Sequence, residues 1–272
     1  MKVFFAVGDS NKFRTSLLVR EGISDILVSY SDIAGNPDKV RRAAKFSSIL
    51  VDSGAFSEGK GKAQISRPQY ASFLEALPWA YPEVHRRLTG YINLDNMFDP
   101  ELTLANQQFF ESRALRPIPV YHYGEPEKYL EGYVGKYDLV ALGGLAVGTV
   151  TTSKLKTWWD GIADRYPGQK FHLLGTMQFR AFVDHQPYSI DAITWMAAGI
   201  YGDLLTIGED GGPARGGLIM PLGEDGELVG QSLSKGNLRR VALSKHFFTT
   251  EEMYLHNIRA IKYFSDMKWA TP

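Results

Sequence analysis

Three aspartates in this chain lie at or near the ends of short apolar runs. Asp52 follows SSILV, Asp95 follows GYINL and Asp191 lies in YSIDA, while His122 ends the run PIPVYH. Two carboxyl groups opposed across a ligand suit cleavage at a sugar carbon, because one attacks or stabilises the cationic transition state while the other moves the proton. A third carboxylate can accept two adjacent N–H donors, such as those of guanine. The alternative for each Asp is a plain N-cap of the following helix.

Small and aromatic residues beside these positions suit a planar ligand. Asp52 is followed by Ser-Gly-Ala-Phe, in which Gly54 permits a sharp bend and Phe56 offers a flat face for stacking. In ALGGLAVG, Gly143 and Gly144 leave backbone groups unshielded for the edge of a heterocycle. This stretch lacks the spacing of a dinucleotide fingerprint. The structural alternative for Phe56 is a core residue behind a turn.

Short apolar runs alternate with longer amphipathic segments along the chain. The predicted strands lie at 3–7, 25–30, 47–52, 90–95, 117–122, 137–144, 170–175 and 188–192. The predicted helices between them lie at 37–46, 67–88, 101–115, 125–137, 153–167 and 178–186. This α/β alternation predicts a parallel sheet covered by helices, and eight units favour a (β/α)8 TIM barrel, with a doubly wound open sheet as the alternative. In a barrel the carboxyl ends of the strands build the site, so the three Asp and His122 are expected to converge.

The last quarter of the chain departs from this alternation. A glycine-rich stretch, about 208–237, contains LIMPL and ELVGQSL around GEDG and predicts an appended β-hairpin. The segment 249–269 opens with a capping Thr and an acidic first turn and predicts a C-terminal helix. No linker, internal repeat or low-complexity tract marks a second domain, so we expect one domain over 1–272.

Composition removes several classes of function. Thirty basic and thirty acidic residues give a net charge of zero, so any polyanion must be met by a local patch. The absence of cysteine excludes disulfides, thiolate zinc sites and cysteine nucleophiles. Six histidines without HxH or HExxH spacing disfavour a metal hydrolase, and we expect no metal and no cofactor. Without a run of about 18 apolar residues, we expect a soluble cytoplasmic protein and no membrane partner.

Two motifs resemble those of one enzyme family. DSGAF, residues 52–56, is similar to the DSGGF signature of the tRNA-guanine transglycosylases, and GGLAVG, residues 143–148, resembles their base-binding loop in the same order. HLLGTM at 172–177 and PARGG at 213–217 resemble the family more weakly. The resemblance covers roughly residues 45 to 235. It implies a TIM-barrel enzyme, a pentosyltransferase that exchanges guanine in nucleic acid for a 7-deazaguanine.

The resemblance also implies roles for individual residues. Asp191 would be the nucleophile that attacks C1′ of the sugar, and Asp52 the general acid/base for the leaving and incoming bases. Phe56 would stack on the base and Asp95 would recognise the purine edge. The full set implied to bind the base is Ser53, Phe56, Asp95, His122, Gly143, Gly144 and Leu145.

Contacts to the nucleic acid are expected from basic residues after the eighth strand. The candidates are Arg215, Lys235, Arg239 and Arg240, with further basic residues at 41–45 and 85–87. The alternative is that such clusters are ordinary solvated faces. Because C1′ is buried in a duplex, the target nucleotide would have to be turned out of the stack.

One departure from the family bears on the polymer. The tRNA enzymes hold a structural zinc with three Cys and a His, which a chain without cysteine cannot do. The chain therefore resembles the DNA-acting branch of phages and modification islands, which inserts preQ0 or a relative into DNA and implies a possible homodimer. A tRNA-acting enzyme, a barrel N-glycosidase or nucleoside hydrolase, and an inactive nucleic-acid-binding barrel remain the alternatives.

Overall fold

The computed structural model describes most of the chain. The described residues are 1–8, 11–55, 65–145, 150–196, 205–207, 213–214, 218–219 and 249–266. Five residues singled out from the sequence lie outside them: Phe56, Arg215, Lys235, Arg239 and Arg240. Their roles stay predictions.

The described strands and helices alternate along the chain. The strands are β1 (Lys2–Val7), β2 (Asp25–Ser29), β3 (Ser48–Asp52), β4 (Leu88–Tyr91), β5 (Val120–His122), β6 (Leu139–Gly143), β7 (Lys170–Leu173) and β8 (Ser189–Ala192), followed by β9 (Thr206–Ile207), β10 (Pro213–Ala214) and β11 (Leu218–Ile219). The helices are α1 (Lys12–Arg20), α2 (Tyr30–Ile33), α3 (Pro37–Ala43), α5 (Arg67–Ala80), α6 (Pro82–His85), α7 (Pro100–Ser112), α8 (Lys128–Tyr133), α9 (Thr152–Arg165) and α12 (Thr250–Asp266), with 3-10 turns η1 (Phe179–Phe182) and η2 (Thr194–Met196).

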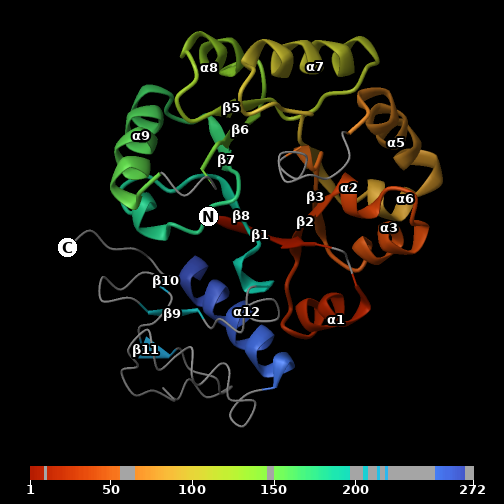
Figure 1. Ribbon diagram of the computed structural model, residues 1–272, viewed down its shortest axis with the longest axis vertical. Coiled ribbons are helices and arrows are strands. Elements are labelled where there is room, and N and C mark those ends of the chain that lie inside the picture. The colour runs from red at the N-terminus through yellow and green to blue at the C-terminus, as the bar shows by residue number, and fades with distance from the viewer. Residues whose placement is uncertain are drawn as a thin grey trace.

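The first eight strands form one parallel sheet in the order β4-β3-β2-β1-β8-β7-β6-β5. In Figure 1 the helices α1, α3, α5, α7, α8 and α9 follow one another around the outside of these strands. A parallel sheet needs crossover connections, and the helices supply them. The prediction of eight parallel strands in an α/β fold is confirmed, the curled sheet is consistent with a TIM-like fold, and the closed (β/α)8 barrel stays a prediction.

The two outer strands of this sheet approach each other just beyond their ends. Ile92 and Ile118 form an isolated parallel bridge. The Ile118 N–H donates to Tyr91 O at 2.8 Å, and the Asn93 N–H donates to Ile118 O at 3.0 Å. The sheet is thus curled far enough for β4 and β5 to meet at this point.

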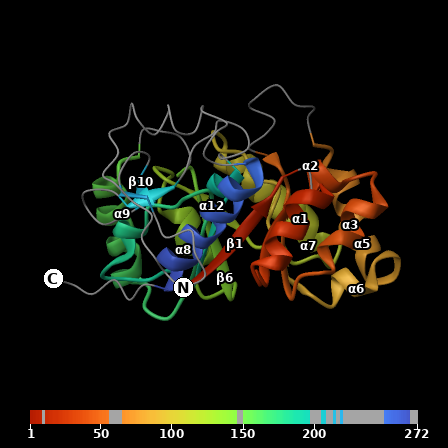
Figure 2. The ribbon, with the colours of Figure 1, turned by 90° about the horizontal axis from the view of Figure 1, so that it is seen from below.

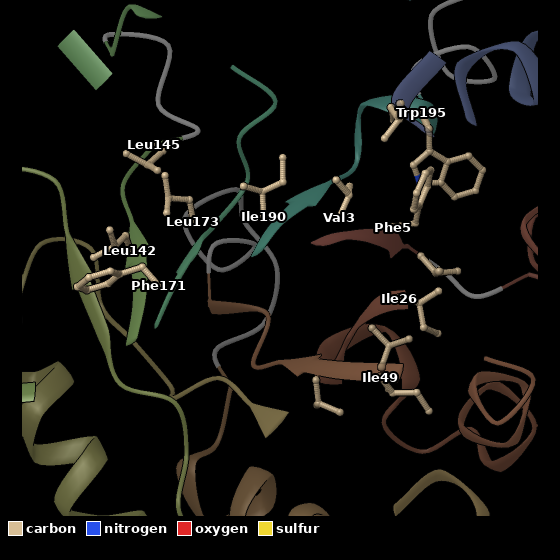
Figure 3. Close-up of a cluster of buried hydrophobic side chains, with 14 of the residues drawn as sticks. Val3, Phe5, Ile26, Ile49, Leu142, Leu145, Phe171, Leu173, Ile190 and Trp195 are labelled. Carbon is tan, nitrogen blue, oxygen red and sulfur yellow. The ribbon is translucent and has the colours of Figure 1, made fainter. Parts of the chain in front are cut away.

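Alternation along each strand divides the apolar side chains into two layers. The inner cluster comprises Phe4, Ala6, Leu27, Leu50, Ile92, Ile118, Val120 and Ala141. The residues between them face the helices and join the larger outer cluster, part of which is drawn in Figure 3. In that view Phe171, Leu173 and Ile190 of adjacent strands line one such layer. Because side chains alternate with period two, the apolar inner residues fix which polar residues also point inward.

Helix α12 confirms the helix predicted for the C-terminal segment. Thr249 and Glu252 form a capping box at its start, in which the Thr249 N–H donates to Glu252 Oε2 at 2.6 Å and the Glu252 N–H donates to Thr249 Oγ1 at 3.3 Å. In Figure 1 the helix lies between α1 and the short strands β9 to β11, and in Figure 2 it lies between α1 and β10. Trp195 packs on Tyr254 of α12 and donates its indole N–H to Ala6 O of β1 at 2.9 Å. No described helix is both long and apolar enough to cross a membrane.

Several boundaries differ from those expected. The helix predicted at 178–186 is only the 3-10 turn η1, whose three phenylalanine and alanine side chains are buried. Strand β4 ends at Tyr91, four residues before Asp95, because the following segment bonds to α7: the Asn93 side chain donates to Thr103 O at 2.9 Å and the Asn106 side chain to Leu94 O at 2.6 Å. Of the stretch 208–237, in which a hairpin is predicted, the described parts are Pro213–Ala214 and Leu218–Ile219, each of which pairs antiparallel with Thr206–Ile207. The segment ELVGQSL lies outside the described residues.

Candidate active site

The polar candidates continue the inward-facing rows of the strands. Asp52 lies two residues beyond Leu50, and His122 lies two residues beyond Val120, both of which belong to the inner cluster. Asp191 stands in register with Phe4 of the same cluster, and Asp52 with Ser29. The sheet therefore presents an apolar interior toward the amino ends of its strands and acidic groups toward their carboxyl ends.

Among the residues that the structure describes, no basic side chain contributes to the environment of Asp52. Burial, reinforced by the negative charges of Asp95 and Asp191, raises the pKa of Asp52 from 3.8 to about 7. The Gly54 N–H donates to Oδ2 of Asp52 at 2.9 Å and opposes this rise, as does the Ser53 backbone. The influence of Asp95 and Asp191 on one titrating group means that the three carboxyl groups belong to one electrostatic site.

Asp191 is held from the neighbouring strand β7. The Gly175 N–H donates to its Oδ1 at 2.7 Å, and Nε2 of His172 lies 3.5 Å from the same oxygen. His172 is fully buried, and its Nδ1 shares a hydrogen bond of 2.8 Å with Ser189 Oγ. The second carboxylate oxygen of Asp191 accepts no hydrogen bond within the described part of the chain. One oxygen is thus fixed and the other is available for chemistry.

Asp95, His122 and Glu125 form a row of alternating charge. Nε2 of His122 lies 2.8 Å from Asp95 Oδ2, and Nδ1 lies 2.8 Å from Glu125 Oε1. Burial alone would lower the pKa of His122, but the hydrogen bonds and charges of the two carboxylates raise it to about 9. At neutral pH the ring is therefore an imidazolium that donates a hydrogen bond to each side.

The glycines near these side chains are required by close packing. Gly54 has φ +89°, and a Cβ there would lie 2.4 Å from Ser31 Oγ. A Cβ on Gly143 would lie 2.6 Å from Cδ2 of His122, while Gly144 has φ +77° and approaches the Tyr123 backbone. Gly143 thus makes room for the His122 ring. The predicted contact of Gly143 and Gly144 with a base stays a prediction.

The remaining residues that the resemblance implies to bind the base are Ser53, Leu145 and His122, and the side chain of each is engaged by other parts of the protein. The Ser53 side chain is buried and its Oγ accepts from the Ala55 N–H at 3.3 Å, so it stabilises the turn after β3. The Leu145 side chain belongs to the outer apolar cluster, which leaves only its backbone for a base. Both ring nitrogens of His122 are bonded to carboxylates, so its predicted contact with the base would displace one of them.

Sequence reasoning missed two members of this site. His172 is the inward-facing residue of KFHLLG, and a polar residue at period two in an apolar strand was the available signal. Glu125 lies three residues after His122 and resembled the acidic first turn of a helix. Among the described residues, no group of three or more His, Asp or Glu side chains is arranged to hold a metal ion.

Comparisons with known proteins assign no family. No protein-family model matches the chain, and no curated protein matches it. Among solved structures, the chain is similar to the YdjI aldolase from Escherichia coli K12, with 12% sequence identity over 97% of this chain and 90% of that chain, and a TM-score of 0.48. Similarity at this level transfers no activity.

Proposed function

We propose that this protein is a pentosyltransferase that exchanges guanine in DNA for a 7-deazaguanine base such as preQ0. The observation that carries the proposal is Asp52, whose pKa is raised to about 7 by burial and by the charges of Asp95 and Asp191. A group that is half-protonated near neutral pH gives and takes protons with similar ease. The DSGAF and GGLAVG motifs supply the identity of the reaction, by resemblance.

The two carboxyl groups take different parts in the proposed reaction. The free oxygen of Asp191 attacks C1′, the bond from C1′ to N9 of guanine breaks, and Asp52 gives its proton to the leaving base. The incoming 7-deazaguanine then gives its N9 proton to Asp52 and attacks C1′, which releases the Asp191 carboxylate. Atoms and protons balance over the cycle, and no water is consumed.

The geometry around Asp191 suits a nucleophile that is also a leaving group. The Gly175 N–H donates to a single oxygen of Asp191, and Nε2 of His172 lies 3.5 Å from that oxygen without a hydrogen bond to it. Donors that stabilise the carboxylate lower the energy of the departing group in the second step. The cost is a weaker attack in the first step.

The proposed reaction requires a closed barrel. Asp52 lies on β3 and Asp191 on β8, and these strands are separated by β2 and β1 in the sheet order, so closure is needed to bring the two side chains to one site. The Ile92 to Ile118 bridge supports closure between β4 and β5. We expect the amide of Ile118 to exchange with solvent as slowly as amides inside the sheet. Fast exchange there would favour the open sheet.

A label-exchange assay tests the function. Duplex DNA, single-stranded DNA and tRNA carrying labelled guanine are incubated with the protein and preQ0, and release of label is followed together with incorporation of the new base. We expect release from DNA that requires preQ0 and is abolished in Asp191→Asn. Asp38→Asn, an exposed Asp on α3, is the matched control and should leave the rate unchanged.

The same assay separates the rival functions. Release from tRNA alone identifies the tRNA-acting alternative. Release of base without incorporation identifies an N-glycosidase. No release from any polymer, with nucleic-acid binding intact in both variants, overturns enzymatic base exchange.

A further inference from the structure

A buried ion triad occupies the part of the site where the purine edge is expected. It joins Asp95 after β4, His122 at the end of β5 and Glu125 in the turn that follows. The His122 side chain is 3% exposed and that of Glu125 is 8% exposed, whereas Asp95 is 17% exposed. Only the Asp95 end of the triad therefore offers accessible surface to a ligand.

Every donor of the His122 ring is committed within the triad. Nε2 serves Asp95 and Nδ1 serves Glu125, each at 2.8 Å. Oδ1 of Asp95 accepts no hydrogen bond from any described residue, and Oδ2 retains a lone pair. The group left to read a base here is an Asp95 carboxylate whose position and counter-charge come from His122.

Glu125 is bound at both of its oxygens. Oε1 lies against Nδ1 of His122, and Oε2 accepts the backbone N–H of His122 at 2.9 Å. A Gln of the same shape can accept the backbone N–H through its oxygen, but its NH2 then faces Nδ1 of His122 and can only donate to a ring that has lost the proton there. It also removes the charge that favours a protonated ring. Glu125 thus sets both the orientation and the charge of His122.

We propose that Glu125 is a positioning residue: through its contact with Nδ1 of His122 it holds the ring against Asp95, and so orients the Asp95 carboxylate that selects bases with two adjacent N–H donors. This inference rests on the proposed function, because it names what the same site recognises. Guanine and its 7-deaza relatives present N1–H and the 2-amino group side by side, whereas hypoxanthine lacks the amino group. The Asp95 carboxylate accepts a charge-assisted hydrogen bond from each of the two N–H groups, so a base that has both donors binds more tightly than a base that has one.

Other ionisable groups lie near the triad, but none of those described below carries a positive charge. Asp52 on β3 is coupled to Asp95, and Tyr121 on β5 and Tyr133 on α8 sense the charge of Glu125, which raises the pKa of both tyrosines in addition to the effect of burial. Gly143 on β6 borders the ring with no charge. The positive charge near Asp95 within these contacts comes from His122, so its loss leaves Asp95 beside Asp52 uncompensated.

The test compares Glu125→Gln with Glu131→Gln, an exposed Glu on α8, as the matched control. Equilibrium binding of guanine and of hypoxanthine is measured at pH 7.5, and the His122 ring is titrated by proton NMR. In Glu125→Gln we expect the His122 pKa to fall and the preference for guanine to drop roughly tenfold, in line with the worth of one bidentate base contact. In the exchange assay KM for the incoming base should rise while kcat changes much less.

The outcomes separate this inference from the proposed function. Base exchange by the wild-type protein, with unchanged guanine preference in Glu125→Gln, overturns the inference and leaves the function. Guanine preference that depends on Glu125, without base exchange, overturns the function and leaves the inference. Failure of the wild type to bind either base overturns both.

The wild-type protein provides a second measurement if Glu125→Gln does not fold. The His122 ring of the wild type should titrate near pH 9, as measured by proton NMR. A His122 that titrates near 6.5 overturns the inference.

Discussion

Asp52 and Asp95 follow neighbouring strands of one sheet, yet their surroundings differ in one decisive respect. Asp95 lies 2.8 Å from a protonated imidazole, while Asp52 has backbone N–H groups and two nearby negative charges. The pKa of Asp52 accordingly rises to about 7. The comparison teaches that the position of a carboxyl group at a strand end does not fix its role, because the nearest cation decides whether it carries protons or accepts hydrogen bonds.

The strongest test of this contrast is the substitution Asp52→Asn. It preserves shape and still accepts the Gly54 N–H, but it cannot transfer a proton. We expect base exchange to fall by about 10³-fold, within the range that general acid/base groups contribute. Exchange kinetics of this variant at pH 7 provide the measurement, and a loss below about tenfold would assign the proton transfer elsewhere.

The same substitution should change stability in the opposite direction. A group with a raised folded-state pKa contributes stability that is present below its unfolded pKa, here 3.8, and is lost as the pH rises through about 7. At pH 8 wild-type Asp52 is therefore a buried charge near two others. Thermal unfolding at pH 8 should show Asp52→Asn to be more stable than wild type by between about 1 and 4 kcal/mol, and a destabilised variant would contradict the burial of an uncompensated charge.

The next largest effect on stability is expected from glycine substitutions, which should differ between the turn beside Asp52 and the turn beside His122. Gly54, beside Asp52, combines φ +89° with a Cβ that would lie 2.4 Å from Ser31 Oγ, whereas Gly124, beside His122, has φ +88° and open space. Gly54→Ala should cost about 2 to 4 kcal/mol and Gly124→Ala about 1 to 2 kcal/mol, since only the first adds a clash to the left-handed conformation. Denaturant unfolding of both variants measures the difference, and equal costs would show that the serines move aside.

A smaller effect is expected where Gly143 makes room for His122. A Cβ there would meet Cδ2 of the ring at 2.6 Å and Nε2 at 3.1 Å. Gly143→Ala should cost about 1 to 3 kcal/mol and lower the His122 pKa, because the ring is pushed from Asp95. Gly161→Ala in α9, where nothing lies within 4 Å, is the control and should stabilise the helix. An unchanged His122 titration in Gly143→Ala would contradict the tight fit.

The smallest effect is the pH dependence of stability from His122. Its folded pKa of about 9 exceeds the ordinary 6.5, so the stabilisation is complete below pH 6.5 and is lost as the pH rises through about 9. Between pH 6.5 and 9.5 the wild type should lose about 1 to 3 kcal/mol more than His122→Gln. Parallel stability curves of the two proteins would show that the triad carries no net charge interaction.

Sequence predicted the strands better than the loops, for a physical reason. In runs such as SSILVD and YSIDA, one face of the strand points into the sheet interior and the other toward the helices. The apolar pattern of such a run therefore indicates both the strand and the side chains that are buried. The segment 178–186 has helical spacing but forms only a 3-10 turn, in which Phe179 and Phe182 are buried and Phe179 stacks on Phe264. Tertiary packing of this kind leaves no local signature.

In the candidate site, too, residues near strand ends could be predicted from the sequence, whereas one residue in a turn could not. Asp52 ends β3 and Asp191 lies one residue before the end of β8, and both were singled out from their positions near strand ends, while their roles came from the family resemblance. Glu125 was missed, since its role depends on a turn that returns its side chain to His122, and the raised pKa of Asp52 depends on charges from two distant segments. Residue type at a strand end can be predicted, but the charge environment requires the fold.

The coupling of Asp52 to Asp191 is tested most directly by titrating the side-chain carboxyl carbon of Asp52 by ¹³C NMR in wild type and in Asp191→Asn. We expect an apparent pKa near 7 in the wild type and a lower value in the variant, because one of the two neighbouring charges is gone. A value near 3.8 in the wild type, or the same value in both proteins, would contradict a shared site for the two carboxyl groups.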